Sequence, residues 1–99
     1  MHPAKVCRER LVQLTDLPNV GPAMAADFRL LGFMQPMELV GQSAWQLYQQ
    51  LNQLTGQRHD PCVLDVLLSV QAFLDGAPAQ AWWAFTAQRK RDFPNLNPP

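Results

Sequence analysis

The sequence predicts an all-α fold, and two observations carry this prediction. Apolar residues recur at three- and four-residue spacing through most of the chain, which is typical of helices with one buried face. No stretch alternates apolar and polar residues over the length of a strand with enrichment in β-branched residues. We therefore expect a compact bundle of about five helices around one core.

Length and charge limit the functions that this chain can have. It has 99 residues, enough for a single core, and eight Lys and Arg residues balance eight Asp and Glu residues. Without an overall basic field, nucleic-acid binding would depend on a local patch or on oriented backbone dipoles. Because no secretory pattern or membrane-spanning apolar run occurs, we expect a cytoplasmic protein that makes no membrane contact.

Proline and glycine mark the helices in the first half. Pro3 suits a first helical turn, and an apolar stripe follows it, so we expect the first helix over residues 3–15. Pro22 begins a second helix over residues 22–31, which Gly32 ends as a left-handed cap. Residues 35–41 then form a short helical connector.

Three further helices are expected in the second half. Ser43 caps a helix over residues 44–54, and Asp60 caps another over residues 61–74. The latter helix is apolar almost all round, which predicts either the buried centre of the fold or a subunit interface. A last helix is expected over residues 79–91, and proline excludes a helix from residues 93–99.

The turn before the second expected helix, residues 17–22 (LPNVGP), has the chemistry of an anion site. Free N–H groups at a helix start point outward at one spot, which suits a phosphate. Gly21 leaves room for a close approach, and Asn19 is the non-glycine residue that best tolerates left-handed backbone angles. We expect Val20 to point inward as the apolar plug of the turn.

This stretch resembles the helix-hairpin-helix motif of DNA repair, recombination and replication proteins, which holds the DNA backbone without reading its sequence. The residues that match are Leu14, Leu17, Pro18, Val20, Gly21, Pro22, Ala25 and Phe28. Two residues depart from it: Asn19 replaces the first hairpin glycine, and Ala23 stands where DNA-binding members often carry lysine. Asp16 adds a negative charge beside the turn. The hairpin therefore either contacts a phosphate or only packs two helices together.

Most of the chain is similar to a small bacterial family of pathogenicity-locus and mitomycin-resistance proteins. The likeness rests on residues 17–25, 29–32, 47–48, 58–65 and 82–83. It implies tandem helix-hairpin-helix units in residues 1–78, the second of them degenerate and turning over residues 55–60. It also implies that residues 79–99, an aromatic helix and a proline-rich tail, pack on these units. It implies no particular biochemical activity.

Cysteine and histidine raise two further possibilities. Cys62 lies at a helix start, where free N–H groups would lower the pKa of its thiol and make it an activated, reactive cysteine. We favour the alternative, in which Asp60 caps the helix and Cys62 is a small buried hydrophobe. The pairs His2 with Cys7 and His59 with Cys62 have the composition of a zinc site. Their spacing fits no familiar finger, so we predict no metal and no cofactor.

The aromatic residues near the end of the chain also have two interpretations. Trp82, Trp83 and Phe85, followed by the basic residues 89–91, could form a stacking platform with a basic clamp for single-stranded nucleic acid. We favour an aromatic cover over the open end of a small core, followed by a solvated charged turn. The basic residues would still supply charge toward a phosphate.

These observations lead to two hypotheses. The first is a DNA-binding or DNA-associated module without sequence preference, and the alternative is a protein-interaction module on the same scaffold; either would be a monomer or a homodimer. Catalytic residues and enzyme activity are not expected, because no nucleophile–base pair or phosphate-binding loop occurs. The expected phosphate-binding residues are Asn19, Val20, Gly21, Ala23, Arg89, Lys90 and Arg91.

Overall fold

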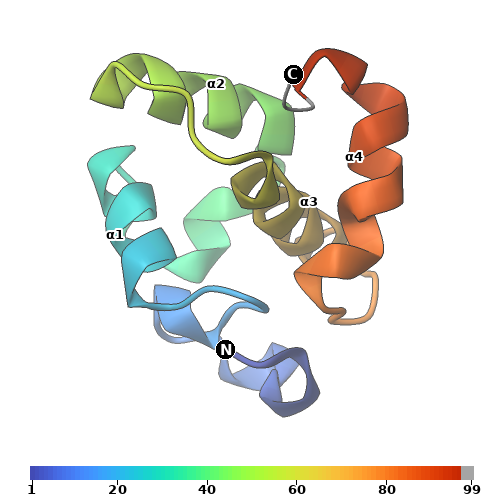
Figure 1. The fold of residues 1–99 in the computed structure, drawn as a ribbon. Coiled ribbons are helices and arrows are strands. Elements are labelled where there is room, and N and C mark those ends of the chain that lie inside the picture. The colour runs from blue at the N-terminus through green and yellow to red at the C-terminus, as the bar shows by residue number, and fades with distance from the viewer. Residues whose placement is uncertain (97–99) are drawn as a thin grey trace.

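The computed structural model describes residues 1–96, and this part of the chain contains helices and turns but no strand. Its α-helices are α1 (Pro22–Leu30), α2 (Ala44–Thr55), α3 (Pro61–Leu74) and α4 (Thr86–Asp92) (Figure 1). Short 3₁₀ turns occupy Pro3–Lys5, Arg8–Arg10, Leu14–Asp16, Pro36–Leu39, Trp82–Phe85 and Pro94–Leu96. The all-α fold class is confirmed. The expected five helices become four α-helices within the described residues, because one expected helix is absent.

Local sequence signals set the ends of α1, α2 and α3, and α1 begins at Pro22 without a side-chain cap. The Ser43 hydroxyl accepts a hydrogen bond from the Gln46 amide at 3.3 Å, and Asp60 accepts one from the Cys62 amide at 2.8 Å. Gly56 ends α2 in the left-handed conformation with φ of 70°. These three helices therefore lie within one residue of the bounds that the sequence predicts.

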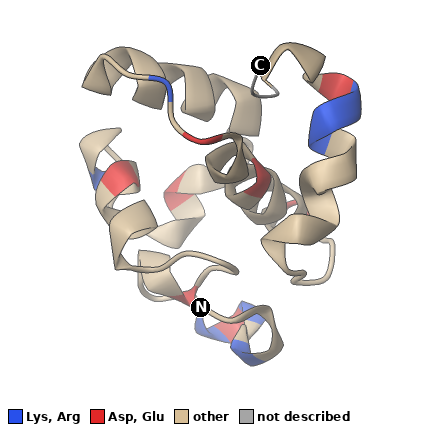
Figure 2. Cartoon of the chain, in the orientation of Figure 1, with Lys and Arg blue, Asp and Glu red and all other residues tan. Residues whose placement is uncertain are grey.

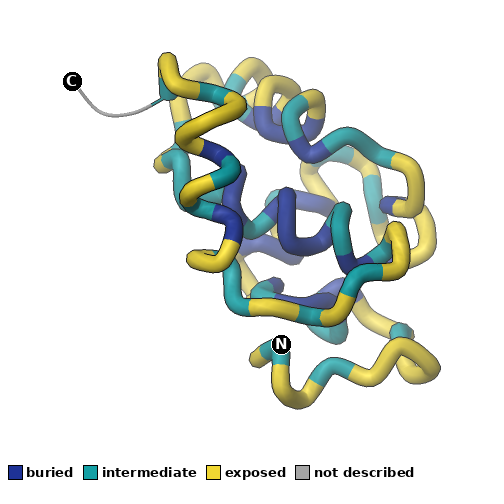
Figure 3. The backbone as a smooth tube through the Cα atoms, turned by 90° about the vertical axis from the view of Figure 1, so that its right-hand side faces the viewer, coloured by how far each residue is buried: buried dark blue, intermediate teal, exposed yellow. Residues whose placement is uncertain are grey.

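Helix α3 is the buried centre of the fold, which confirms the first of the two interpretations of its apolar sequence. Its side chains pack against α2 on one side and against α4 and the turn Trp82–Phe85 on another. The buried apolar residues of α3 are Leu64, Leu67, Leu68, Val70 and Phe73. Figure 3 shows the buried segments gathered in the interior, with the N-terminal segment exposed. Each fully buried Leu or Phe contributes about 1.5–3 kcal/mol to stability.

The helix expected over residues 3–15 is wrong. The chain forms three separate 3₁₀ turns there, and extended residues such as Cys7 and Leu11 lie between them. Long-range contacts explain the difference: the Arg8 guanidinium donates to the carbonyls of Phe73 and Ala77 at 2.5 and 2.7 Å and lies 4.0 Å from the centre of the Phe73 ring. These bonds hold the segment against the end of α3. Its own backbone bonds lie within the short turns, from the Lys5 amide to the His2 carbonyl and from the Arg10 amide to the Cys7 carbonyl, both at 2.9 Å.

The C-terminal part also differs from the expected single helix over residues 79–91. A 3₁₀ turn, Trp82–Phe85, leads directly into α4, which continues to Asp92. Beyond it, Phe93 stacks on Trp45 with ring centres 4.6 Å apart, and Pro94–Leu96 forms a last turn. Residues 97–99 of the expected proline-rich tail lie outside the described part of the chain. Across residues 1–96, every helix is too short or too polar to cross a lipid bilayer.

Candidate functional site

The loop that precedes α1 has the backbone geometry that its sequence predicts. Asn19 adopts the left-handed conformation with φ of 65°, and the Val20 side chain is 1% exposed, so both expectations are confirmed. Gly21 has an extended backbone with φ of −96°, which any residue can adopt, and a Cβ added there would meet no atom within 4 Å. Neither backbone strain nor packing requires glycine at position 21, and the space beside its Cα is open.

Two of the four loop amides expected to bind phosphate are already bonded. The Asn19 amide donates to the Met1 carbonyl at 2.8 Å, and the Val20 amide donates to the Leu17 carbonyl at 3.3 Å. No residue among 1–96 accepts a hydrogen bond from the amides of Gly21 and Ala23, and both residues are exposed. We therefore correct the expected set: of its four loop residues, Gly21 and Ala23 have backbone donors without an acceptor among residues 1–96.

The Asn19 side chain holds the loop in place and does not face a ligand. Its Nδ2 donates to the Ser69 hydroxyl of α3 at 2.9 Å and to the Gln80 carbonyl at 2.8 Å. The loop is thereby fixed to α3 and to the segment that leads into Trp82. Sequence reasoning missed this role, although Ser69, a polar residue in an otherwise mostly apolar helix, was a signal that a polar partner packs there.

Two tryptophans lie beside this loop. A surface groove of about 640 Å³ is lined by Asn19, Gly21, Pro22, Trp82 and Trp83, among others. The Trp83 side chain is 65% exposed, and its ring is nearly perpendicular to that of Trp82, with ring centres 5.5 Å apart. Phe85, in contrast, is buried in the core. The expected aromatic cover is therefore confirmed for Phe85, whereas Trp83 faces solvent.

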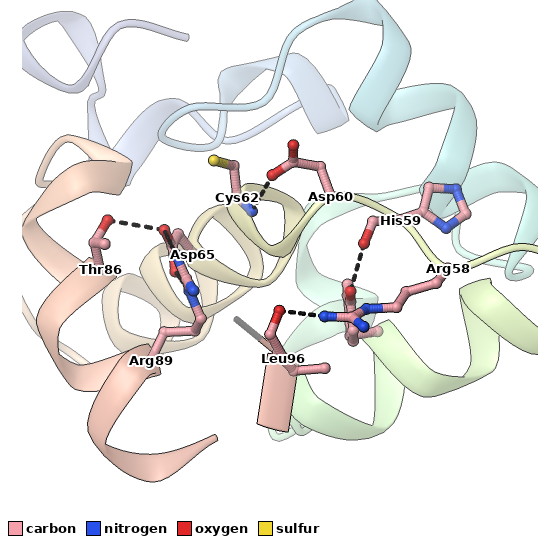
Figure 4. Close-up of polar contacts among 9 residues, drawn as sticks. Arg58, His59, Asp60, Cys62, Asp65, Thr86, Arg89 and Leu96 are labelled. Carbon is pink, nitrogen blue, oxygen red and sulfur yellow. Dashed lines mark hydrogen bonds and ion pairs between the residues drawn. The ribbon is translucent and has the colours of Figure 1, made fainter. Parts of the chain in front are cut away.

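Arg89 is not at the surface, which corrects its expected role in phosphate binding. It is 5% exposed, and its Nε donates to the Asp65 carboxylate at 2.9 Å (Figure 4). The Thr86 hydroxyl donates to the same carboxylate at 2.8 Å. The hydrogen bond to Asp65 raises the pKa of Arg89, so the guanidinium is charged at neutral pH. This contact joins α4 to α3 inside the protein.

Lys90 and Arg91 are exposed, and Arg91 pairs with Asp92 at 3.2 Å. Figure 2 shows the basic stretch of α4 at the opposite end of the molecule from the loop before α1. The structure therefore does not bring residues 89–91 and the loop together in one site.

Other basic residues lie nearer to the loop. The N-terminal segment beside it carries basic residues (Figure 2). Lys5, Arg10 and Met1 line a hollow of about 250 Å³. The Met1 amine ties this segment to the loop, because it donates a hydrogen bond to the Val20 carbonyl at 2.8 Å. Asp16 lines the same hollow. Backbone hydrogen bonds from residues 12 and 13 lower the pKa of this carboxylate, so it opposes part of the positive charge. Sequence reasoning missed Lys5 and Arg10 because it placed them on a helix.

The alternative sites find no support in the geometry. Burial, followed by hydrogen bonding to Asp60, raises the pKa of the Cys62 thiol, which is opposite to the lowered pKa that an activated thiol needs. Among residues 1–96, no three His, Cys, Asp or Glu side chains come together as a metal site, so the candidate zinc ligands do not converge.

The turn over residues 55–60, the expected second hairpin, has its polar groups engaged within the protein. The Tyr48 hydroxyl donates to the His59 carbonyl at 2.5 Å, and the His59 amide donates to Asn52 at 2.8 Å. The Arg58 guanidinium donates to the Leu96 carbonyl (Figure 4). These bonds fix the approach to α3, and they leave the loop before α1 as the candidate site.

Comparison with known proteins agrees with the family resemblance of the sequence. A family model described as Pathogenicity locus matches residues 7–91. A protein of Streptomyces lavendulae described as Mitomycin resistance protein McrB is 38% identical over 78 residues, which cover 79% of this chain and 74% of that protein. The search of solved structures found no significant match.

Proposed function

The chain belongs to the Cdd1, or Pathogenicity locus, family, and we propose from the geometry of the loop before α1 that it is a DNA-associated helical module that contacts the phosphate backbone without reading base sequence. The observation that carries this proposal concerns two exposed residues, Gly21 and Ala23, whose backbone amides have no acceptor among residues 1–96. In this proposal residues 17–30 form the turn and second helix of a helix-hairpin-helix element. The turn Leu14–Asp16 stands in place of its first helix.

Electrostatics favours an anion at this position. The start of α1 carries about half a positive charge from its aligned peptide dipoles, and its free N–H groups point at one spot. Lys5 and Arg10 on the neighbouring N-terminal segment add positive charge, which Asp16 offsets in part. With few phosphate contacts and no net charge on the chain, we expect weak binding that falls steeply with salt.

The test is a salt titration of binding to a duplex and a four-way junction, measured by fluorescence anisotropy. Ala23→Lys adds a cation where DNA-binding helix-hairpin-helix proteins often carry one, so it should raise affinity and steepen the log–log salt slope by about 1. Ala23→Glu should weaken binding without destabilising the fold, since an acidic side chain in the first turn favours the helix.

Ala26→Glu is the matched control. It makes the same charge change at another exposed position of α1, one turn further from the loop, so it should weaken binding less than Ala23→Glu. Absence of binding at low salt by both the unmodified protein and Ala23→Lys would reject the proposal.

A protein-interaction function is the second candidate, and a specific observation favours it. Leu30 and Leu54 are 54% and 56% exposed and line a hollow of about 410 Å³ between the ends of α1 and α2. Exposed leucines that share a hollow are typical of a contact surface. A partner that co-purifies after nuclease treatment and is lost with Leu54→Glu would support this function, whereas a partner lost on nuclease treatment alone would contradict it.

A further inference from the structure

We propose that the groove beside the loop is a stacking site for an unpaired nucleobase, with Trp83 as the platform. This inference rests on the proposed DNA association and names its substrate class: DNA with unpaired bases, such as single strands and open junctions. In this arrangement one nucleotide contacts the protein twice, through its base at Trp83 and through its phosphate at the start of α1.

The exposure of Trp83 is the first observation. Trp83 is 65% exposed, although tryptophan is on average a highly buried residue. Trp82 is partly buried and packs edge-on against it, so the pair forms a supported ring with solvent access. Such a ring is suited to stacking, because every base has an aromatic face.

The groove has the size and surroundings that a nucleotide needs. Its volume of about 640 Å³ lies within the range of pockets that hold small organic ligands. The residues that line the groove also include Gly21 and Pro22, and the Gly21 amide has no acceptor among residues 1–96. An aromatic ring and a free N–H donor therefore share one surface, as base and phosphate do in a nucleotide.

Charge distinguishes this occupant from a peptide. The residues of 1–96 that line the groove include no Asp or Glu, and the neighbouring hollow carries Lys5 and Arg10 against one carboxylate, Asp16. A cationic peptide would find no carboxylate in the groove, and a neutral peptide carbonyl could accept from the Gly21 amide but would bring no negative charge to the half-positive start of α1. An anionic ligand with a flat ring satisfies both features.

The experiment compares three probes of equal length on the full chain: an oligo(dT) strand, a strand of abasic sites and a blunt duplex. We expect oligo(dT) to bind more tightly than the abasic strand and to quench tryptophan fluorescence. Trp83→Ala should weaken oligo(dT) binding about 5- to 150-fold, the range for loss of one stacked base, and should change duplex binding less than about twofold. Trp83→Phe should keep most of the affinity for oligo(dT).

Leu54→Ala is the matched control, because it shortens another exposed apolar side chain outside the groove and should leave all three affinities unchanged. Equal binding of oligo(dT) and the abasic strand, or equal losses with Trp83→Ala on oligo(dT) and duplex, would overturn the stacking site. Salt-dependent duplex binding in that case would leave the proposed function intact, whereas no binding to any probe at low salt would reject both.

Discussion

Arg89 of α4 and Asp65 of α3 form an ion pair at 2.9 Å in which both side chains are withdrawn from solvent. Asp65 also accepts a hydrogen bond from Thr86, so one carboxylate receives donors from two positions on α4. A buried charge is stable only when it is paired and hydrogen-bonded. The pair therefore fixes how α4 lies on the centre of the fold.

Removing one member of this pair should destabilise the protein strongly. We expect Arg89→Met to lower the free energy of unfolding by about 3–5 kcal/mol, because it leaves the Asp65 charge uncompensated. Asp65→Val combined with Arg89→Met should recover most of that loss, since two apolar side chains need no partner. Urea denaturation of both variants measures the effect. A double variant less stable than Arg89→Met would show that the charges themselves are favourable.

Asn19 should be sensitive to the kind of side chain that replaces it. Asn19→Ala removes the hydrogen bonds to Ser69 and Gln80. It also leaves a residue at positive φ that lacks the polar side chain by which asparagine tolerates this conformation. We therefore expect the free energy of unfolding to fall by about 2–4 kcal/mol. Asn19→Gly loses the same bonds but tolerates the backbone, and should be about 1 kcal/mol more stable than Asn19→Ala. Thermal and urea unfolding provide the comparison. Equal stability of the two variants would contradict a conformational role for this position.

Acid should weaken the start of α3. The hydrogen bond from the Cys62 amide lowers the pKa of Asp60 in the folded state. A lowered folded-state pKa means that stabilisation is complete above the unfolded value of about 3.9 and is lost as pH falls through the folded value. An asparagine side chain can cap a helix without titrating. At about pH 7 we therefore expect Asp60→Asn to be less stable than the unmodified protein. Below about pH 4 the unmodified protein loses this advantage, so the two stabilities should become similar. Urea midpoints across the acid range measure this, and a difference that stays constant with pH would refute it.

The two cysteines should differ in their reaction with thiol reagents. Cys7 is exposed, whereas Cys62 is partly buried and has a raised pKa because of burial and the neighbouring Asp60. At about pH 7.5 we expect a disulfide reagent to modify Cys7 first, with Cys62 reacting more slowly and accelerating as pH approaches its raised pKa. Single variants Cys7→Ser and Cys62→Ser assign the two phases. Faster modification of Cys62 at neutral pH would restore the activated-thiol interpretation.

Sequence alone determined the parts of the fold that depend on neighbouring residues. Ser43 and Asp60 cap their helices with their own side chains, and Gly56 ends α2 by a backbone angle that glycine adopts easily. The same holds for the loop before α1, where the left-handed Asn19 and the buried Val20 follow from local chemistry. These features involve residues a few positions apart, so the sequence pattern contains them.

Tertiary structure decided which of the predicted residues meet. Residues 3–15 have helical spacing, yet Arg8 bonds to the carbonyls of Phe73 and Ala77, more than sixty positions away, and the helix is not formed. Arg89 belonged to a basic run that looked solvated until the packing of α4 placed Asp65 opposite it. Asp65 in an apolar helix was a signal that a cation lies nearby, because buried carboxylates need partners, but the sequence does not say which cation.

The position of Trp83 beside the loop before α1 was also decided by the tertiary structure. It depends on the path of the whole chain, so a pattern of neighbouring residues does not contain it.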